Sequence, residues 1–444
     1  MGCSPHDLRR LERQKWSTHT GTKENSESDT VEEVQDNEGK SKALHETFFP
    51  NPSCADETDI TDNYQYPAEA FPFEEVTDDH IIHALQKLKP YKAPGPNGIP
   101  NVVLKSCTES LLPYLGPLFR ATFSLEVYPD TWKQSTTVVL RKPGRPDYTV
   151  AKAYCPIALM DTITKTLSSC ITDILTYHAE NLCLLPNTHF GGRPGRSTTD
   201  AIQLMTSFIH QNWEKGNVVS VLFLDMKAAF PSVLVKRLLH NLRRRWIPKQ
   251  YVDWIERKMG GRTTLLKFDD FVSAVFDIAN GCDQGCPLSV FCYLFYNADL
   301  IDIHKPKSKE LVLAFMDDVN IVKAAKTFQK ANKGLNNMMT REGGAQTWSK
   351  THSSTFEMDK LKLVCFSRKC KRHVTPTAKT RPLQRPNLHL GDIVIKPVTS
   401  HRYLGVILDR SLRYHEHLAH AEAKATKYAL QMRRLMKINH GISL

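Results

Sequence analysis

The chain has 444 residues, 41% of them apolar, so it can hold two or three domains or one large lobed fold. Its net charge is +12, but residues 1–80 carry 7 basic and 19 acidic residues, whereas residues 81–444 carry 52 and 28. A basic body behind an acidic leader indicates a polyanionic partner, such as a nucleic acid. The 11 scattered cysteines form no CxxC pair, which argues against a disulfide framework and for a reducing compartment. No run of 18 apolar residues occurs, so we expect no membrane span.

The N-terminal part changes character near residue 65. Residues 17–62 are rich in Ser, Thr, Glu, Asp and Asn and poor in apolar residues, which predicts that they are mostly disordered. Further on, Thr77 is a suitable cap for a helix. The apolar residues behind it recur at helical spacing: Ile81, Ile82, Leu85 and Leu88.

The body mixes strands and helices without strict alternation, which predicts an α+β fold. Strands are expected, in chain order, at residues 136–144, 217–226, 311–315, 319–324, 361–367, 388–397 and 403–409. The stretch at residues 151–175 is expected to enter a long amphipathic helix, and further helices are expected at residues 235–246, 286–303, 331–351 and 422–438.

Two adjacent acids, Asp317 and Asp318, separate the apolar runs "LVLAF" and "VNIVKA", a pattern typical of a tight hairpin. Alone, such a pair reads most simply as a solvated turn. However, Asp225 ends a buried strand, and if that strand lies beside the hairpin, three carboxylates converge. Three such charges require a cation. Oxygen ligands with open positions suit Mg²⁺, and two such ions support in-line displacement at phosphorus. The three acids therefore point to phosphoryl or nucleotidyl transfer.

Eight stretches in one fixed order now allow a comparison with a known family. Together they resemble the reverse transcriptase of non-LTR (LINE-like) retrotransposons, especially fungal ones. They are "YKAPGPNGIPNVVLK" (91–105), "VVLRKPGRPDYTVAKAYCPIAL" (138–159), "HFGGRPGRSTTDAI" (189–202), "LFLDMKAAF" (222–230), "GCDQGCPLS" (281–289), "AFMDD" (314–318), "FEMDKLKLVCFSR" (356–368) and "HRYLGVILD" (401–409).

The resemblance implies a right-hand polymerase fold with fingers, palm and thumb and an antiparallel palm sheet. We expect an acidic, mostly disordered leader and then a reverse transcriptase domain at about residues 123–409. The expected division is leader 1–62, fingers with part of the palm 63–215, palm with the catalytic carboxylates 216–370, and palm end with partial thumb 371–444.

The resemblance also assigns roles to the acids and to one lysine. Asp225, Asp317 and Asp318 would be the catalytic carboxylates and the ligands of two Mg²⁺ ions, with Mn²⁺ as a substitute. Lys360 would act near the leaving pyrophosphate.

Four further residues match positions that contact the incoming nucleotide in this family. Phe230 would place a ring against the sugar, where it would clash with a 2′-hydroxyl and favour dNTP over rNTP. Gln284 and Gly285 would lie along the nucleotide, and Lys142 would be the fingers cation near the triphosphate.

Several positions depart from the family pattern. Cys155 stands where an arginine grips phosphate, and a thiol cannot replace a bidentate cation. Pro231 stands where the family has an aspartate, and a proline lacks a backbone donor and restricts Phe230 before it. The remaining departures are Asn97, Asp283, Cys286 and Val290, and at the position of Asp283 the family pattern has a proline.

The function expected from these features is RNA-directed DNA polymerase, which extends a primer 3′-hydroxyl with dNTPs on an RNA template. The alternative is a catalytically decayed remnant of this fold that only binds nucleic acid. The departures at Cys155 and Pro231 favour this alternative. An RNA-dependent RNA polymerase is disfavoured by Phe230. The resemblance further implies an intracellular, nuclear location with a cytoplasmic ribonucleoprotein stage. The chain is expected to be a fragment of a longer reading frame.

Overall fold

The computed structural model describes residues 16–18, 32–34, 36–50, 57–371 and 381–436. Within them the chain forms two compact units, each built from separate stretches of sequence. The first unit comprises residues 1–186, 227–299 and 349–355, and the second comprises residues 187–226, 300–348 and 356–444. The division into contiguous fingers, palm and thumb therefore stays a prediction. Among the described residues, no helix is long and apolar enough to cross a membrane.

The elements of the first unit are helices around a mixed sheet, together with a separate two-stranded sheet of β1 and β2. In chain order they are β1 (Trp16–Thr18), β2 (Glu32–Val34), α1 (Asn37–Phe48), α2 (Asp78–Lys87), α3 (Asn101–Ser106), α4 (Thr108–Ser124), η2 (Asp130–Lys133), β3 (Gln134–Arg141), η3 (Ala151–Ala153), β4 (Tyr154–Leu159), α5 (Thr162–Asn181), α7 (Val235–Arg244), α8 (Lys249–Met259), β6 (Arg262–Phe268), β7 (Phe271–Val272), β8 (Phe276–Ile278) and α9 (Pro287–Ile301), whose last residues pass into the second unit.

The sheet of the first unit has the strand order β4-β3-β6-β7, with β8 also paired to β6. Strands β3 and β4 are antiparallel and place Leu140 opposite Cys155, whereas β3 and β6 run parallel. Strand β4 is the edge of this sheet, so its outer backbone groups are free to bind a loop. The predicted cap also forms, because the Thr77 hydroxyl accepts a hydrogen bond from the N–H of His80 at the start of α2.

The expected disorder of residues 17–62 is wrong for residues 37–48, which form helix α1. Asp36 caps this helix through a hydrogen bond from the N–H of Gly39. Leu44 and Phe48 are buried in a cluster with Val139, Tyr154 and others of the sheet. Composition missed this helix because a few buried apolar side chains stabilise it against the sheet. The expectation for residues 19–31, 35 and 51–56 lies outside the described residues.

The second unit is built around a sheet with helices on both faces. Its elements, in chain order, are α6 (Thr198–Glu214), β5 (Val218–Leu224), η4 (Pro306–Ser308), β9 (Glu310–Phe315), β10 (Asp318–Ala325), α10 (Phe328–Thr340), α11 (Ala345–Thr351, which ends in the first unit), η5 (Met358–Lys360), β11 (Lys362–Phe366), β12 (Cys370–Lys371), β13 (Arg381–Pro382), β14 (Leu388–Leu390), β15 (Ile393–Ile395), β16 (Pro397–Val398), β17 (Ser400–Tyr403), β18 (Val406–Asp409) and α12 (His415–Met436).

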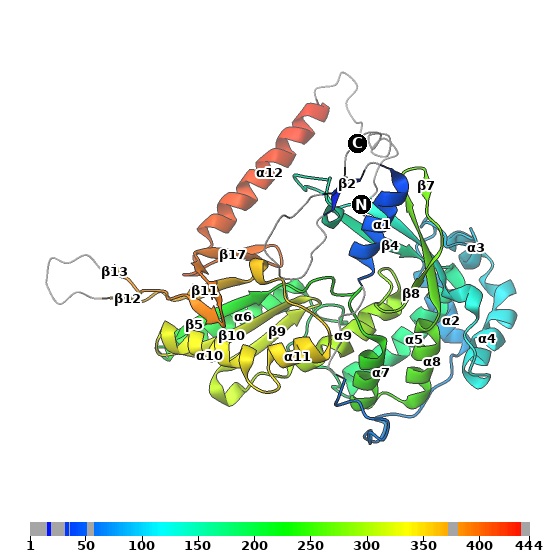
Figure 1. Cartoon of the computed structure of the whole chain (residues 1–444), viewed down its shortest axis with the longest axis horizontal. Helices are drawn as coiled ribbons and strands as arrows, with labels where there is room; N and C mark the ends of the chain where they lie inside the picture. Colours follow the sequence, from blue (N-terminus) through cyan, green and yellow to red (C-terminus); the bar gives the residue numbers. More distant parts are fainter. Residues whose placement is uncertain (1–15, 19–31, 35, 51–56, 372–380, 437–444) are drawn as a thin grey trace. The chain divides into compact units, whose positions relative to one another are not determined.

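The main sheet of the second unit has the strand order β16-β11-β5-β10-β9, with the fully buried β5 at its centre. Figure 1 shows α10 beside these strands. Alternate residues of β5 face opposite sides of the sheet. Val219, Val221 and Phe223 pack in the cluster that includes the α6 side chains. On the other face, the Ser220 hydroxyl donates to Asn332 of α10.

The predicted α+β class is confirmed, and the second sheet is antiparallel except for the β11–β16 pair. The predicted helix at residues 331–351 is instead two helices, α10 and α11. They are separated around Gly343, whose φ of +66° ends a helical path. The hairpin of β9 and β10 forms as predicted.

Candidate active site

Strand register in the second unit brings the predicted acids together. Val319 of β10 pairs with Leu224 of β5, and the strands are antiparallel. One step further, Asp318 comes opposite Asp225, with both side chains on the same face of the sheet. Cβ atoms of such opposed residues lie about 4.5–5.5 Å apart. Asp317 adjoins them in the hairpin turn.

The hairpin turn has two residues, Met316 and Asp317, because Phe315 pairs with Asp318. Met316 has φ +58°, a conformation that L residues adopt at a cost. Gly191 packs against this turn, since a Cβ there would lie 2.5 Å from the backbone nitrogen of Met316. Phe190 also donates its N–H to the carbonyl of Ala314, at 2.8 Å. The segment before α6 therefore supports the turn that carries Asp317.

The electrostatics of the acids show that they share one environment. The pKa of Asp318 is raised to about 6, because surrounding protein displaces water from the carboxylate and because Asp317 and Asp225 lie nearby. The pKa of Asp317 is also raised, by loss of hydration and by Asp225. Solvent still reaches both side chains. No cation among the described residues forms an ion pair with either.

Asp225 differs from its neighbours because it has a cationic partner. Lys360 Nζ lies 2.9 Å from Asp225 Oδ2 and 2.5 Å from Glu357 Oε2. The N–H of Glu357 donates to the carbonyl of Asp225 at 2.9 Å, which fixes this segment beside β5. Burial disfavours the charged form of Lys360, but hydrogen bonds and charges of Glu357 and Asp225 outweigh it and raise the pKa.

The chemistry of this acidic set fits divalent cations better than any other group. Two of the three carboxylates have no counter-charge among the described residues. Their pKa values are raised because the surrounding protein displaces water and because the neighbouring acids add like charge. As the side chains stand, no three Asp, Glu, His or Cys residues of the described part are arranged to hold a metal ion. Asp225 is instead directed at Lys360. Asp225, Asp317 and Asp318 are the residues that would hold the ions.

The predicted nucleotide-contacting residues lie in the first unit. Gln284 and Gly285 form an exposed loop on the edge strand β4, because the N–H of Ala158 donates to the carbonyl of Gln284 at 2.9 Å. Gly285 has φ +123°, and a Cβ there would lie 3.0 Å from the Ala158 carbonyl oxygen, so only glycine fits. The Gln284 amide also donates to the sulfur of Cys155, at 3.4 Å. The structure therefore brings Cys155 and the Gln284 loop together.

Phe230 is half-buried and stacks on Tyr293 of α9, with ring centroids 4.7 Å apart and an interplanar angle of 22°. Its carbonyl accepts a hydrogen bond from the N–H of Cys282, at 2.9 Å. The N–H groups that follow Pro231, those of Ser232 and Val233, are bonded within a turn. Pro231 therefore sits in an ordered turn whose Phe230 ring has a firm support.

Lys142 lies directly after β3 and is partly buried. Its ammonium donates to the carbonyl of Lys152, at 3.1 Å, and its N–H donates to Ala153. By strand alternation, Lys142 shares a face with Leu140 and hence with Cys155 opposite Leu140. Lys142 therefore lies on the same face of the sheet as Cys155, the position at which the resemblance expects an arginine.

Comparison with known proteins identifies the family. The model of the family described as reverse transcriptase (RNA-dependent DNA polymerase) matches residues 140–408, more than half of the chain. The chain belongs to this family. The match falls within the reverse transcriptase domain expected at about residues 123–409.

This reverse transcriptase family member is similar to proteins from transposons and mobile elements of Drosophila melanogaster. It is 23% identical over 404 residues to the probable RNA-directed DNA polymerase from transposon BS, covering 90% of this chain and 43% of that protein. It is 25% identical over 331 residues to the corresponding protein from transposon X-element, covering 74% and 34%. The RNA-directed DNA polymerase from mobile element jockey is 22% identical over 380 residues, covering 84% and 40%. The chain thus spans less than half the length of these curated relatives.

Sequence reasoning about this family member missed three residues. Glu357 could have been found, because an acid three residues before a lysine is a common pairing distance. Gly191 lies within a stretch that carries the resemblance, but its contact with Met316 depends on the fold. Arg262 has no local signal, since its partner Asp283 is 21 residues away.

Proposed function

We propose that this chain is an RNA-directed DNA polymerase that adds dNTPs to a primer 3′-hydroxyl. The observation that carries the proposal is the convergence of Asp225, Asp317 and Asp318 where the adjacent inner strands β5 and β10 end and begin, within a chain that matches the reverse transcriptase family. Two divalent cations bound there, Mg²⁺ or Mn²⁺, would stabilise charge on the attacking and leaving oxygens.

The residues of the second unit would supply position and charge. The three carboxylates are fixed by β5 and the supported hairpin turn, so their geometry does not depend on a mobile loop. Glu357 and Asp225 stabilise the charged form of Lys360, so its ammonium would be present to stabilise the charge of a leaving pyrophosphate and to hold the proton that it takes up.

The residues of the first unit would recognise the nucleotide. The Phe230 ring, supported by Tyr293, would exclude a 2′-hydroxyl and so select dNTP. The exposed side-chain amide of Gln284 and the exposed backbone of Gly285 would lie along the nucleotide. The ammonium of Lys142 would bind the negatively charged triphosphate of the nucleotide. The excess of basic residues in 81–444 suits an RNA template and a DNA primer as partners.

The alternative of a decayed remnant that only binds nucleic acid is not favoured, because the family match includes all three acids and the structure brings them together. The finer expectations, a fungal type of element and a nuclear location, stay predictions. The relatives compared above come from an insect.

Primer extension tests the proposal. Purified protein, poly(rA)/oligo(dT) and dTTP with Mg²⁺ or Mn²⁺ should give extended primer, and EDTA should stop it. Asp225→Asn provides the matched inactive control, because it removes one proposed metal ligand and keeps the side-chain shape. Extension that is absent from the wild type under both metals would contradict the proposal.

A further inference from the structure

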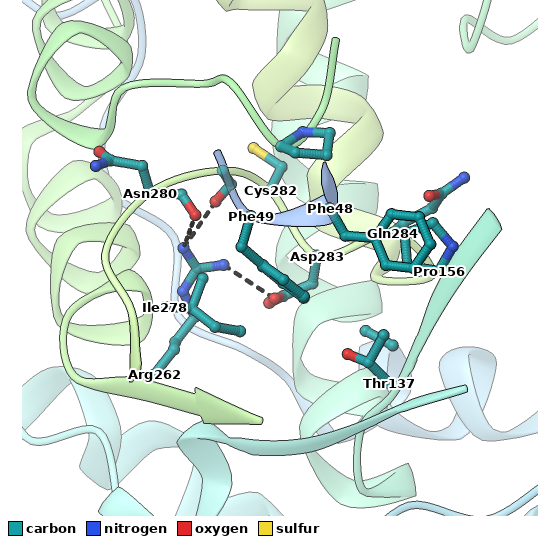
Figure 2. Close-up of a pocket in the computed structure, with 13 residues that line it drawn as sticks. Phe48, Phe49, Thr137, Pro156, Arg262, Ile278, Asn280, Cys282, Asp283 and Gln284 are labelled. Atoms are coloured by element: carbon teal, nitrogen blue, oxygen red, sulfur yellow. Dashed lines mark hydrogen bonds and ion pairs between the residues drawn. The ribbon is translucent and has the colours of Figure 1, made fainter. Parts of the chain in front are cut away.

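Arg262, the first residue of β6, is almost completely buried and directs its guanidinium at the loop before Gln284 (Figure 2). Nη1 donates to Asp283 Oδ1 at 2.9 Å. Nη2 donates to the carbonyls of Gly281, at 2.7 Å, and Asn280, at 3.2 Å. Nε donates to the carbonyl of Met259, at 3.1 Å. One side chain thus binds three residues of the loop and ties them to the end of α8.

Asp283 is one of the positions that depart from the family pattern, which has a proline there. A proline ring restricts a loop covalently, whereas an aspartate does not. The Asp283 side chain is only 12% exposed, and its partner Arg262 is 4% exposed. Buried ion pairs contribute little net stability, but they favour one geometry where their hydrogen bonds are satisfied. The pair is therefore suited to hold the loop in place of the proline.

The loop is attached on both sides of this pair. Before Asp283, the N–H of Gly281 donates to Val233 at 2.7 Å, and that of Cys282 donates to Phe230 at 2.9 Å. After Asp283, the carbonyl of Gln284 accepts from Ala158 of β4. Asp283 is the last buried anchor before the exposed Gln284, so freeing its carboxylate would loosen the residue that follows.

The geometry points to Arg262 and Asp283 as a positioning pair that fixes the Gln284–Gly285 loop for binding of the incoming nucleotide. The inference rests on the proposed function. Neither residue is placed against the nucleotide, and both act through the loop. The consequence is a specific one: loss of the pair weakens nucleotide binding more than it slows the chemical step.

Kinetics provide the first test. Asp283→Asn and Arg262→Gln should each raise the KM for dNTP about 10- to 100-fold, with a smaller change in kcat, because a misplaced contact of about 1 Å can cost that much. The double variant should be little worse than Arg262→Gln alone, because Arg262→Gln already removes the interaction that Asp283→Asn removes. Arg237→Gln is the matched control: Arg237 is equally buried in the same unit and pairs with Asp59 at 2.6 Å. It should leave the KM unchanged.

Hydrogen exchange provides a second test that needs no activity. In the full chain without substrates, Asp283→Asn should speed exchange of the amides of residues 281–285, and Arg237→Gln should not. Faster exchange with a raised KM supports the pair. An unchanged KM in an active protein, or unchanged exchange at the loop, overturns it. A wild type that extends no primer contradicts the proposed function instead, and loop exchange then decides whether the pair fixes the loop. Should Arg262→Gln not fold, Asp283→Asn carries both measurements.

Discussion

Lys360 Nζ lies 2.9 Å from Asp225 Oδ2, so one of the three proposed metal ligands is neutralised by a lysine of the same unit. Glu357 Oε2 lies 2.5 Å from the same ammonium. This places a charged lysine at the acidic cluster whatever else binds there. Lys360 therefore neutralises part of the negative charge of the site and is also the residue proposed to act on the leaving pyrophosphate.

Lys360→Met should lower kcat for primer extension by on the order of 10²-fold, because it removes the proposed proton donor to pyrophosphate. Glu357→Gln should have a smaller effect in the same direction, since the ammonium keeps Asp225 as a partner. The measurement is steady-state extension with saturating dNTP. Lys362→Met, two residues along the chain, is the control. Equal rates for Lys360→Met and Lys362→Met would contradict the role of Lys360.

The raised pKa of Asp318 predicts an unusual dependence of protein stability on pH. Its pKa is raised from 3.8 to about 6 in the folded protein, so the folded state binds this proton more tightly than the unfolded chain. The resulting stabilisation is fully present below about pH 4 and is lost as the pH rises through about 6. In EDTA, Asp318→Asn should therefore raise the Tm at pH 8 and give little gain near pH 4.

Thermal unfolding of the two proteins across this pH range is the measurement. The same substitution at Asp392, an exposed acid of the same unit, tests for general charge effects. Added Mg²⁺ should raise the Tm of the wild type more than that of Asp318→Asn, because ligands that bind only the folded state stabilise it. An increase in Tm from Asp318→Asn that is equal at pH 4 and pH 8 would disprove the electrostatic explanation.

The sequence was sufficient to predict the elements that carry the acids, because buried apolar runs mark β5, β9 and β10. It was not sufficient for their register. Only the pairing of Val319 with Leu224 shows that Asp318 lies opposite Asp225, and such pairing depends on the whole sheet. Helix α1 was missed because acidic composition outweighed its few buried apolar residues. The loop anchor Arg262 was missed because its contacts connect distant parts of the chain.

Phe230→Ala should relax the choice of sugar. The ring is held by Tyr293 at 4.7 Å, so it presents a fixed steric barrier. Its removal should reduce discrimination against rNTP by on the order of 10²-fold, because a hydroxyl-sized clash is lost. Competition between dTTP and UTP in primer extension measures this ratio. An unchanged ratio would show that Phe230 does not contact the sugar.

Cys155→Arg should lower the KM for dNTP about tenfold, because a guanidinium binds phosphate bidentately and a thiol does not. Cys155→Ser, which can still accept the hydrogen bond from Gln284, should change little. If Cys155→Arg changes nothing while the wild type extends primers robustly, then Lys142 or Arg141 already supplies the phosphate-binding charge.

Asp317→Asn in primer extension on poly(rA)/oligo(dT) tests the central claim, that three convergent carboxylates make this chain an RNA-directed DNA polymerase. The substitution keeps the hairpin turn and removes one proposed metal ligand. The wild type should extend the primer with Mg²⁺ or Mn²⁺, and Asp317→Asn should reduce the rate by at least about 10²-fold, as when one group that stabilises transition-state charge is removed. Extension by Asp317→Asn at the wild-type rate would contradict the account.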